Sequence, residues 1–175
     1  TKLAQTLETI AKEGKAGFYD GYVAKDIVEK LQKLGGSHHI EDFANYDAEY
    51  VDPISINYRG YQVFECPPNG QGIVALLMLN VLSHFNLSEY GHNDYRRLHL
   101  EAEVSKIGFY HRNKFLGDPK FSDIPIEKIL SDSYAKKLSK LINFDSTMKK
   151  LDILEMPNNR DTVYISVADN EGNFV

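Results

Sequence analysis

One stretch of alternating residues closes an otherwise helical chain, and it constrains the fold more than any other feature. In residues 162–175, TVYISVADNEGNFV, hydrophobic side chains at Val163, Ile165 and Val167 alternate with more polar ones, as in a half-buried strand. DNEG predicts a turn, and Asn173 begins a returning strand. Because a lone hairpin is only marginally stable in water, we expect residues outside this chain to complete its sheet.

Helical periodicity predominates at the start of the chain. Residues 2–13 place hydrophobic residues on one face and stop at Gly14, and residues 22–34 repeat the pattern before Gly35. SHHIEDFANY predicts a short helix that begins at Ser37 or just after it.

The middle of the chain predicts a hairpin and then a buried helix. Alternation in ISINYRGYQVFECPP, residues 54–68, indicates two strands about an Arg59-Gly60 turn. GIVALLMLNVLSHF is hydrophobic on nearly every side, which predicts a helix buried on most sides. At about 14 residues it is too short to span a membrane, and no hydrophobic run elsewhere reaches the roughly 18 residues of a membrane span.

Further helices and a loop are expected before the tail. The longest helix is predicted over residues 93–116 with Asn93 as its cap, followed by shorter ones in DIPIEKILS and in SDSYAKKLSKLI, where Ser131 or Ser133 can cap. Residues 144–160 show no sustained period, which predicts a long, mobile loop. The pattern as a whole indicates an α+β fold.

Charge and cysteine content exclude several kinds of partner. A formal net charge of -5 argues against nucleic-acid binding and favours small-molecule or protein partners. The single cysteine, Cys66, excludes an internal disulfide and a cysteine-based zinc site. No His or Lys adjoins Cys66, so we expect a buried structural thiol.

Other polar groups are interpreted as structural, and no cofactor or metal is predicted. The side chains of His38 and His39 point apart in any regular element, which favours a surface or capping role. On the long helix, Glu103 lies four residues after His99 and three before Lys106, spacings typical of packing and ion pairing. PPNGQG lacks the Lys-Ser/Thr of a phosphate-binding loop, so a structural turn is favoured.

Thr162 can be interpreted in two ways, as a structural residue or as a nucleophile. As a β-branched residue at the start of a strand it needs no function. If the Asp161–Thr162 bond were cut, however, its new α-amino group, with a reference pKa of about 7.7–8.0, could take the proton of its own hydroxyl and create a nucleophile.

Several landmarks together resemble the γ-glutamyltranspeptidase family of N-terminal-nucleophile hydrolases. They are GFYDG before a helix and Gly-Gly, EDFANYDAEYVDPISINYRGYQVFECPPNGQG, LHLEAEVSKIGFYHRNKFLGDPKF and DTVYISVADNEGNFV, in this order along the whole chain. The resemblance implies a fragment of a four-layer α/β/β/α fold. Residues 1–161 would be the C-terminal, mostly helical part of the large subunit, and residues 162–175 the start of the small subunit.

The resemblance also implies an activity and partners. A precursor would cleave itself between Asp161 and Thr162, and Thr162 would then transfer a γ-glutamyl or related acyl group through an ester to water or an amino acid. The partners would be the small amide substrate and the remainder of both subunits. Because the family's binding pocket is built by residues outside this chain, residues 1–175 alone are expected to be inactive. The family has secreted, periplasmic and cytoplasmic members, so no compartment is predicted.

Two departures keep alternatives open. Well-known members typically have Thr-Thr-His at the nucleophile, whereas Thr162 is followed by Val163 and Tyr164, and their Ser-Gly-rich turn is NGQGI here. Both variants resemble γ-glutamyltransferase-like proteins, some of which accept other acyl groups, including cephalosporin side chains. The alternatives are therefore an acylase with another donor, or a non-catalytic relative that serves binding or assembly.

Overall fold

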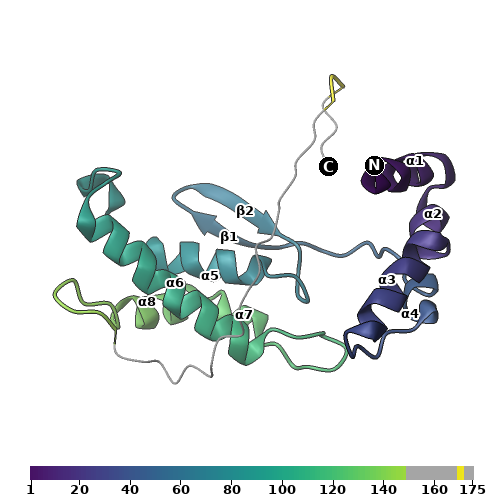
Figure 1. Ribbon diagram of the computed structural model, residues 1–175. Helices are drawn as coiled ribbons and strands as arrows, with labels where there is room; N and C mark the ends of the chain where they lie inside the picture. Colours follow the sequence, from purple (N-terminus) through teal and green to yellow (C-terminus); the bar gives the residue numbers. More distant parts are fainter. Residues whose placement is uncertain (149–168, 172–175) are drawn as a thin grey trace. The chain divides into compact units, whose positions relative to one another are not determined.

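The computed structural model describes residues 1–148 and 169–171, and the chain divides into two compact units, Thr1–Tyr50 and Val51–Val175 (Figure 1). The described residues mix helices with a β-hairpin, which confirms the α+β class at this level. No helix among them is long and hydrophobic enough to cross a membrane.

The Thr1–Tyr50 unit is helical. Its elements are α1 (Lys2–Glu13), α2 (Lys15–Tyr19), α3 (Tyr22–Lys33) and α4 (Ile40–Ala44). The helices expected over 2–13, over 22–34 and after Ser37 are confirmed. The sequence pattern missed α2, because five residues are too few to show a helical period.

Side-chain packing in this unit is tight where the helices meet. Val23, Ala24 and Val28 of α3 are buried. A Cβ added at Gly17 would lie 2.8 Å from the backbone oxygen of Thr9, so the contact between α1 and α2 requires a glycine there.

The Val51–Val175 unit begins with the predicted hairpin. It contains β1 (Ile54–Tyr58), β2 (Tyr61–Glu65), α5 (Gly72–Leu82), the 3-10 helix η1 (Leu87–Glu89), α6 (Tyr95–Phe115), α7 (Ile126–Ile129) and α8 (Asp132–Ser139). The strands are antiparallel, with Ile56 opposite Val63. Arg59 and Gly60 have φ of 55° and 88°, the positive values that a two-residue type I′ hairpin turn requires.

Helix α5 lies at the centre of this unit and contacts the hairpin, α6 and α8 (Figure 1). As predicted, it is buried on most sides, with Leu76, Leu77 and Val81 fully inaccessible to solvent. The core that it shares with α6, α7 and α8 consists of Ile73, Val74, Leu77, Val81, Leu100, Val104, Ile107, Ile129, Ala135 and Leu138.

Two local predictions are wrong. The cap of α6 is Asp94 and not Asn93, since the Asp94 carboxylate accepts the N–H of Arg96 at 2.9 Å. Hydrogen bonds from the side chain and then the backbone of Arg96 lower the pKa of Asp94 to about 2. Cys66 is exposed rather than buried, because it follows β2 in the segment that turns towards α5.

The tail is described only in part. The expected strand at residues 162–167 lies outside the described residues. Of the predicted DNEG turn, residues 169–171 are described, and there Asp169 accepts the N–H of Glu171 at 2.9 Å, a local bond typical of turns.

Candidate functional site

The two predicted site residues, Asp161 and Thr162, lie outside the described residues. The structure describes the chain that precedes them in sequence, up to Met148, and the surface of α6 against which residues 143–148 lie. This face of α6 is buried, and it is unusual because it contains ionisable side chains, which are rarely buried.

The buried stripe of α6 combines hydrophobic and ionisable residues. It consists of Leu100, Glu103, Val104, Ile107, Gly108 and His111, which recur at helical spacing. Glu103 is 1% exposed and His111 5% exposed. Burial of such groups costs free energy unless they are paired, so each needs an identified partner.

Both oxygens of the Glu103 carboxylate accept hydrogen bonds. Lys106 Nζ donates to Oε1 at 2.5 Å, and the backbone N–H of Met148 donates to Oε2 at 2.8 Å. Burial raises the pKa of Glu103, but these two hydrogen bonds and the charge of Lys106 outweigh it, so the pKa lies below its ordinary value. Glu103 is therefore ionised at neutral pH, and the predicted ion pair with Lys106 is confirmed.

Residues 143–148 lie against α6 through further contacts. His99 Nε2 is 2.9 Å from the carbonyl oxygen of Asn143, and the Phe144 ring contacts the rings of Phe85 and His99 at centroid distances of 6.2 and 6.1 Å. The side chain of Met148 packs against the core. This part of the predicted loop contains no helix or strand, as expected, but it is held in place rather than free.

His111 forms a second buried polar network. Its Nδ1 lies 2.7 Å from the carbonyl oxygen of Ile107 and must donate, so Nε2 accepts from the Tyr134 hydroxyl at 2.8 Å. Burial lowers the pKa of His111 and raises that of Tyr134, so both are neutral at pH 7. This network joins α6 to α8.

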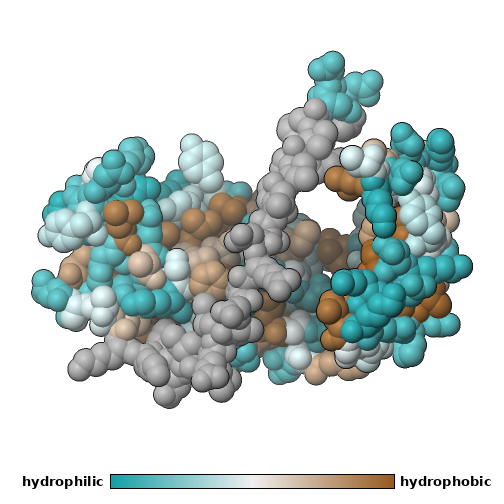
Figure 2. All heavy atoms as spheres, viewed as in Figure 1, coloured by the Kyte–Doolittle hydropathy of each residue, from teal (hydrophilic) through white to brown (hydrophobic). Residues whose placement is uncertain are grey.

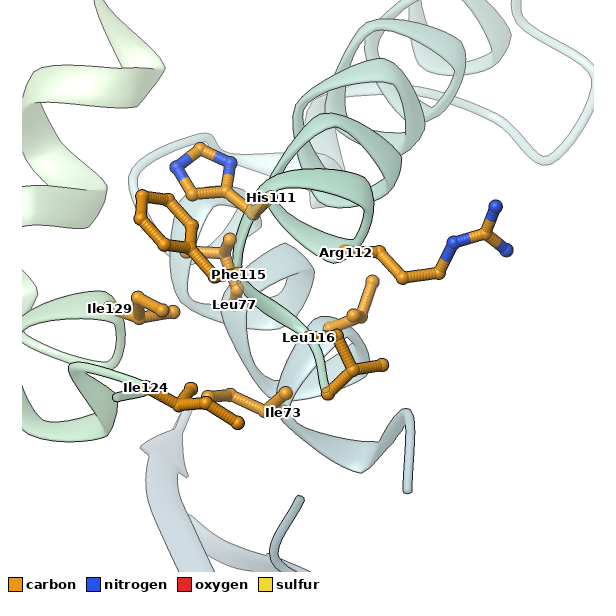
Figure 3. Close-up of a pocket in the computed structure, with 9 residues that line it drawn as sticks. Ile73, Leu77, His111, Arg112, Phe115, Leu116, Ile124 and Ile129 are labelled. Atoms are coloured by element: carbon orange, nitrogen blue, oxygen red, sulfur yellow. The ribbon is translucent and has the colours of Figure 1, made fainter. Parts of the chain in front are cut away.

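Beside His111 lies a small hydrophobic cavity (Figure 3). Its lining includes Ile73, Phe115 and Ile129, and the guanidinium of Arg112 points away from it. A volume of about 10 Å³ is room for roughly one water molecule, so this cavity is a packing defect and not a substrate pocket.

The other candidates have structural roles. His39 caps α4, and its backbone N–H donates to Asp42 at 2.8 Å. PPNGQG leads into α5, where a Cβ on Gly72 would lie 2.6 Å from Glu65 Cβ. Across residues 1–148 and 169–171, no three His, Cys, Asp or Glu side chains are grouped as metal ligands.

Sequence reasoning found Glu103 and His99 but missed their function in holding residues 143–148. The available signal was their spacing of four residues, which places both on one face of α6. The partners Asn143 and Met148 are about 45 residues away in sequence, and no local pattern indicates such a contact.

Large hydrophobic side chains remain exposed in both units, including Leu3 at 68% in one and Phe64 at 60% in the other. Figure 2 shows hydrophobic surface beside polar surface on the visible face. Scattered exposed hydrophobic residues are normal, so they do not by themselves define a site.

Comparisons with known proteins agree on one family. The pattern of the family described as gamma-glutamyltranspeptidase matches residues 1–175. The glutathione hydrolase-like YwrD proenzyme of Bacillus subtilis (strain 168) is 37% identical over 174 residues, which are 99% of this chain and 32% of that protein. The chain thus spans about a third of the length of the curated relatives that it matches.

Two solved structures are also similar to the described fold. The γ-glutamyltranspeptidase of Helicobacter pylori has a TM-score of 0.67 and 33% identity, covering 83% of this chain and 42% of that one. The cephalosporin acylase of Bacillus halodurans has a TM-score of 0.63 and 40% identity, covering 80% of this chain and 26% of that one.

Proposed function

Because the chain belongs to the γ-glutamyltranspeptidase family, we propose that it is part of a self-cleaving acyltransferase or amide hydrolase. The observation that carries the proposal is the family match over residues 1–175, which includes the Asp161-Thr162 pair and the strand pattern after it. That the similar B. subtilis protein is named a proenzyme supports processing.

The proposal extends to the organisation of the whole protein. Residues 1–161 form the later part of a large subunit, and residues 162–175 begin the small subunit of a four-layer α/β/β/α fold. The similar proteins support this arrangement, since the chain covers about a third of the length of the curated relatives that it matches. The partners are thus the remaining subunit segments and a small amide substrate.

In the proposed reaction, Thr162 acts twice. Its hydroxyl first attacks the carbonyl carbon of Asp161, the Asp161–Thr162 peptide bond breaks and so frees the Thr162 amine, and water hydrolyses the resulting ester to give the Asp161 carboxylate and regenerate the Thr162 hydroxyl. That amine then takes the hydroxyl proton while Oγ attacks the substrate amide. The amine product leaves with a proton, and water or an amino acid releases the acyl group from the threonyl ester.

Thr162→Ala in the full-length protein tests both steps. Without the hydroxyl, the precursor is expected to remain one polypeptide and to have no γ-glutamyl transfer or hydrolysis activity. Intact mass spectrometry reports the cleavage, and release of an amine from a γ-glutamyl amide reports the activity. Two subunits of normal mass in this variant would refute the proposal.

Thr162→Ser is the matched variant, because it keeps the hydroxyl and loses only the β-methyl that restricts χ1. We expect slower but measurable self-cleavage and activity. If serine behaved like alanine in both assays, a role for the hydroxyl as nucleophile would lose its main support.

A different acyl donor is the second candidate. The 40% identity to a cephalosporin acylase and the Val163-Tyr164 pair after the nucleophile favour it. Parallel assays with a γ-glutamyl amide and a cephalosporin side-chain amide decide between the two donors. A wild-type protein that stays uncut and hydrolyses neither would instead support a non-catalytic binding or assembly protein.

A further inference from the structure

We propose that Glu103 is a positioning residue for self-cleavage. It holds residues 143–148 against α6 and thereby anchors the start of the segment that leads to the Asp161–Thr162 bond. This inference rests on the proposed self-cleavage and adds a residue that acts on it through the backbone of Met148.

Glu103 is suited to this task because its two oxygens serve different partners. Oε1 accepts from Lys106 on its own helix, whereas Oε2 accepts from the Met148 backbone, 45 residues away in sequence. The carboxylate is almost completely buried, so the Met148 N–H has an ionised acceptor in a site shielded from water. Hydrogen bonds to ionised groups are about twice as strong as neutral ones.

A second set of contacts holds the same segment at another point of α6. One helical turn before Glu103, His99 bonds the carbonyl of Asn143, and Phe144 packs against the His99 ring. Residues 143 and 148 are therefore each fixed to α6, and their partners on that helix lie four residues apart. Residues 143–148 are thus held on α6 at two points.

The anchor shortens the sequence distance between the last described contact with α6 and the scissile bond. Met148 precedes Asp161 by 13 residues, whereas Asn143, which His99 still holds when the Glu103 bond is lost, precedes it by 18. Loop-closure entropy predicts that losing the Met148 anchor lowers the chance of productive positioning by a factor of roughly 1.6 from chain length alone. Loss of the fixed position of the Met148 backbone adds to this.

Glu103→Gln tests the anchor with almost no change in volume. Two donors, Lys106 Nζ and the Met148 N–H, face the side chain from different directions. The glutamine amide has one accepting oxygen, so its NH₂ group must face one of these donors. We expect self-cleavage of the full-length precursor to slow by about twofold or more.

Glu101→Gln is the matched control. Glu101 lies on the same helix and pairs with Arg97 at 2.8 Å, its side chain is 43% exposed, and within the described part of the chain its carboxylate accepts no hydrogen bond from residues 143–148. It should cleave at the wild-type rate. Equal slowing of both variants would show a general effect on α6 and overturn the inference.

A double variant distinguishes the effect of the Met148 hydrogen bond from the effect of the ion pair with Lys106. In Glu103→Gln/Lys106→Met the competing lysine donor is gone, so the glutamine oxygen can accept from Met148 and cleavage should recover towards the wild-type rate. If removing Lys106 fails to restore cleavage, the charge pair and not the bond to Met148 is what matters, and the proposal is wrong.

A readout that does not depend on cleavage completes the test. In the uncleaved Thr162→Ala background, Glu103→Gln should accelerate hydrogen exchange in the peptide containing residues 143–148, while peptides from α5 keep their protection. Unchanged exchange would overturn the anchor. Wild-type protein that never cleaves would instead refute the proposed function, so the two failures are distinguishable.

Discussion

At the scale of single residues, α6 shows that the same direction of pKa shift has opposite consequences for charge. The pKa values of Glu103 and His111 are both lowered within one buried stripe. For Glu103 this favours the ionised carboxylate that bonds Lys106 and Met148, whereas for His111 it favours the neutral ring that bonds Ile107 and Tyr134. The hydrogen-bond partners of each group match the protonation state that its pKa predicts.

His111 predicts how stability changes with pH. Because its pKa is lowered in the folded protein, the unfolded state binds a proton more readily below its own pKa of about 6.5. Stability therefore falls as the pH decreases from about 6.5 towards the lower folded-state pKa. In His111→Gln, which keeps a donor and an acceptor, the loss of Tm between pH 7.5 and pH 5.5 should be smaller than in wild type.

Exposed His38 supplies the control for this comparison. His38→Gln should lose as much Tm over the same pH interval as the wild type, since His38 is exposed and lies outside the buried network of His111 and Tyr134. If His111→Gln lost as much Tm between pH 7.5 and pH 5.5 as the wild type, His111 would not contribute to the pH dependence of stability.

At the scale of elements, the hairpin and α5 meet at a glycine. A Cβ at Gly72 would lie 2.6 Å from Glu65 Cβ and 3.0 Å from the carbonyl oxygen of Cys66. Neither neighbour is the end of a flexible side chain. The first residue of α5 therefore has to be glycine for β2 and α5 to approach as they do.

Gly72→Ala should accordingly destabilise the protein by about 1–3 kcal/mol, the usual range for overpacking. Gly70→Ala, two residues earlier, is the matched control, because its nearest contact to an added Cβ is 3.6 Å away. Urea unfolding measures both. The expectation fails if the two variants lose the same stability.

At the scale of the whole molecule, the two units are joined by an exposed connection. Residues 44–53 are exposed, and residues 46–53 belong to no helix or strand. The strands, the core around α5 and the docked residues 143–148 all lie within the Val51–Val175 unit. The connection is therefore the expected site of first proteolysis.

Limited chymotrypsin digestion of the full-length protein should cut after Tyr50 before it cuts after Tyr61. Both side chains are exposed, at 109% and 77%, but Tyr61 is paired in β2 whereas Tyr50 lies in the connection. Mass spectrometry of early fragments identifies the sites. Earlier cleavage at Tyr61 would mean that the hairpin opens more readily than the connection.

Much of the architecture follows from local sequence patterns. The periodicities of α1 and α3, the hydrophobic run of α5, the helix-forming residues of α6 and the Arg59-Gly60 turn indicate elements that the structure confirms. The errors concern details that a sequence pattern does not resolve. They are the five-residue helix α2, the choice of Asp94 over Asn93 as cap, and the exposure of Cys66. The Asp161-Thr162 assignment stays a prediction, because these residues lie outside those described.

By itself, the sequence determined the family, the order of the elements and the two residues proposed for self-cleavage. Periodicity and motif order depend on residues that are close in sequence, so they can be recognised without a structure. Only the tertiary structure decided what Glu103 and His111 do. Their partners at Met148 and Tyr134 come from distant segments, and burial of Glu103 and His111 strengthens those bonds. Folding alone brings such groups together in a site that excludes water.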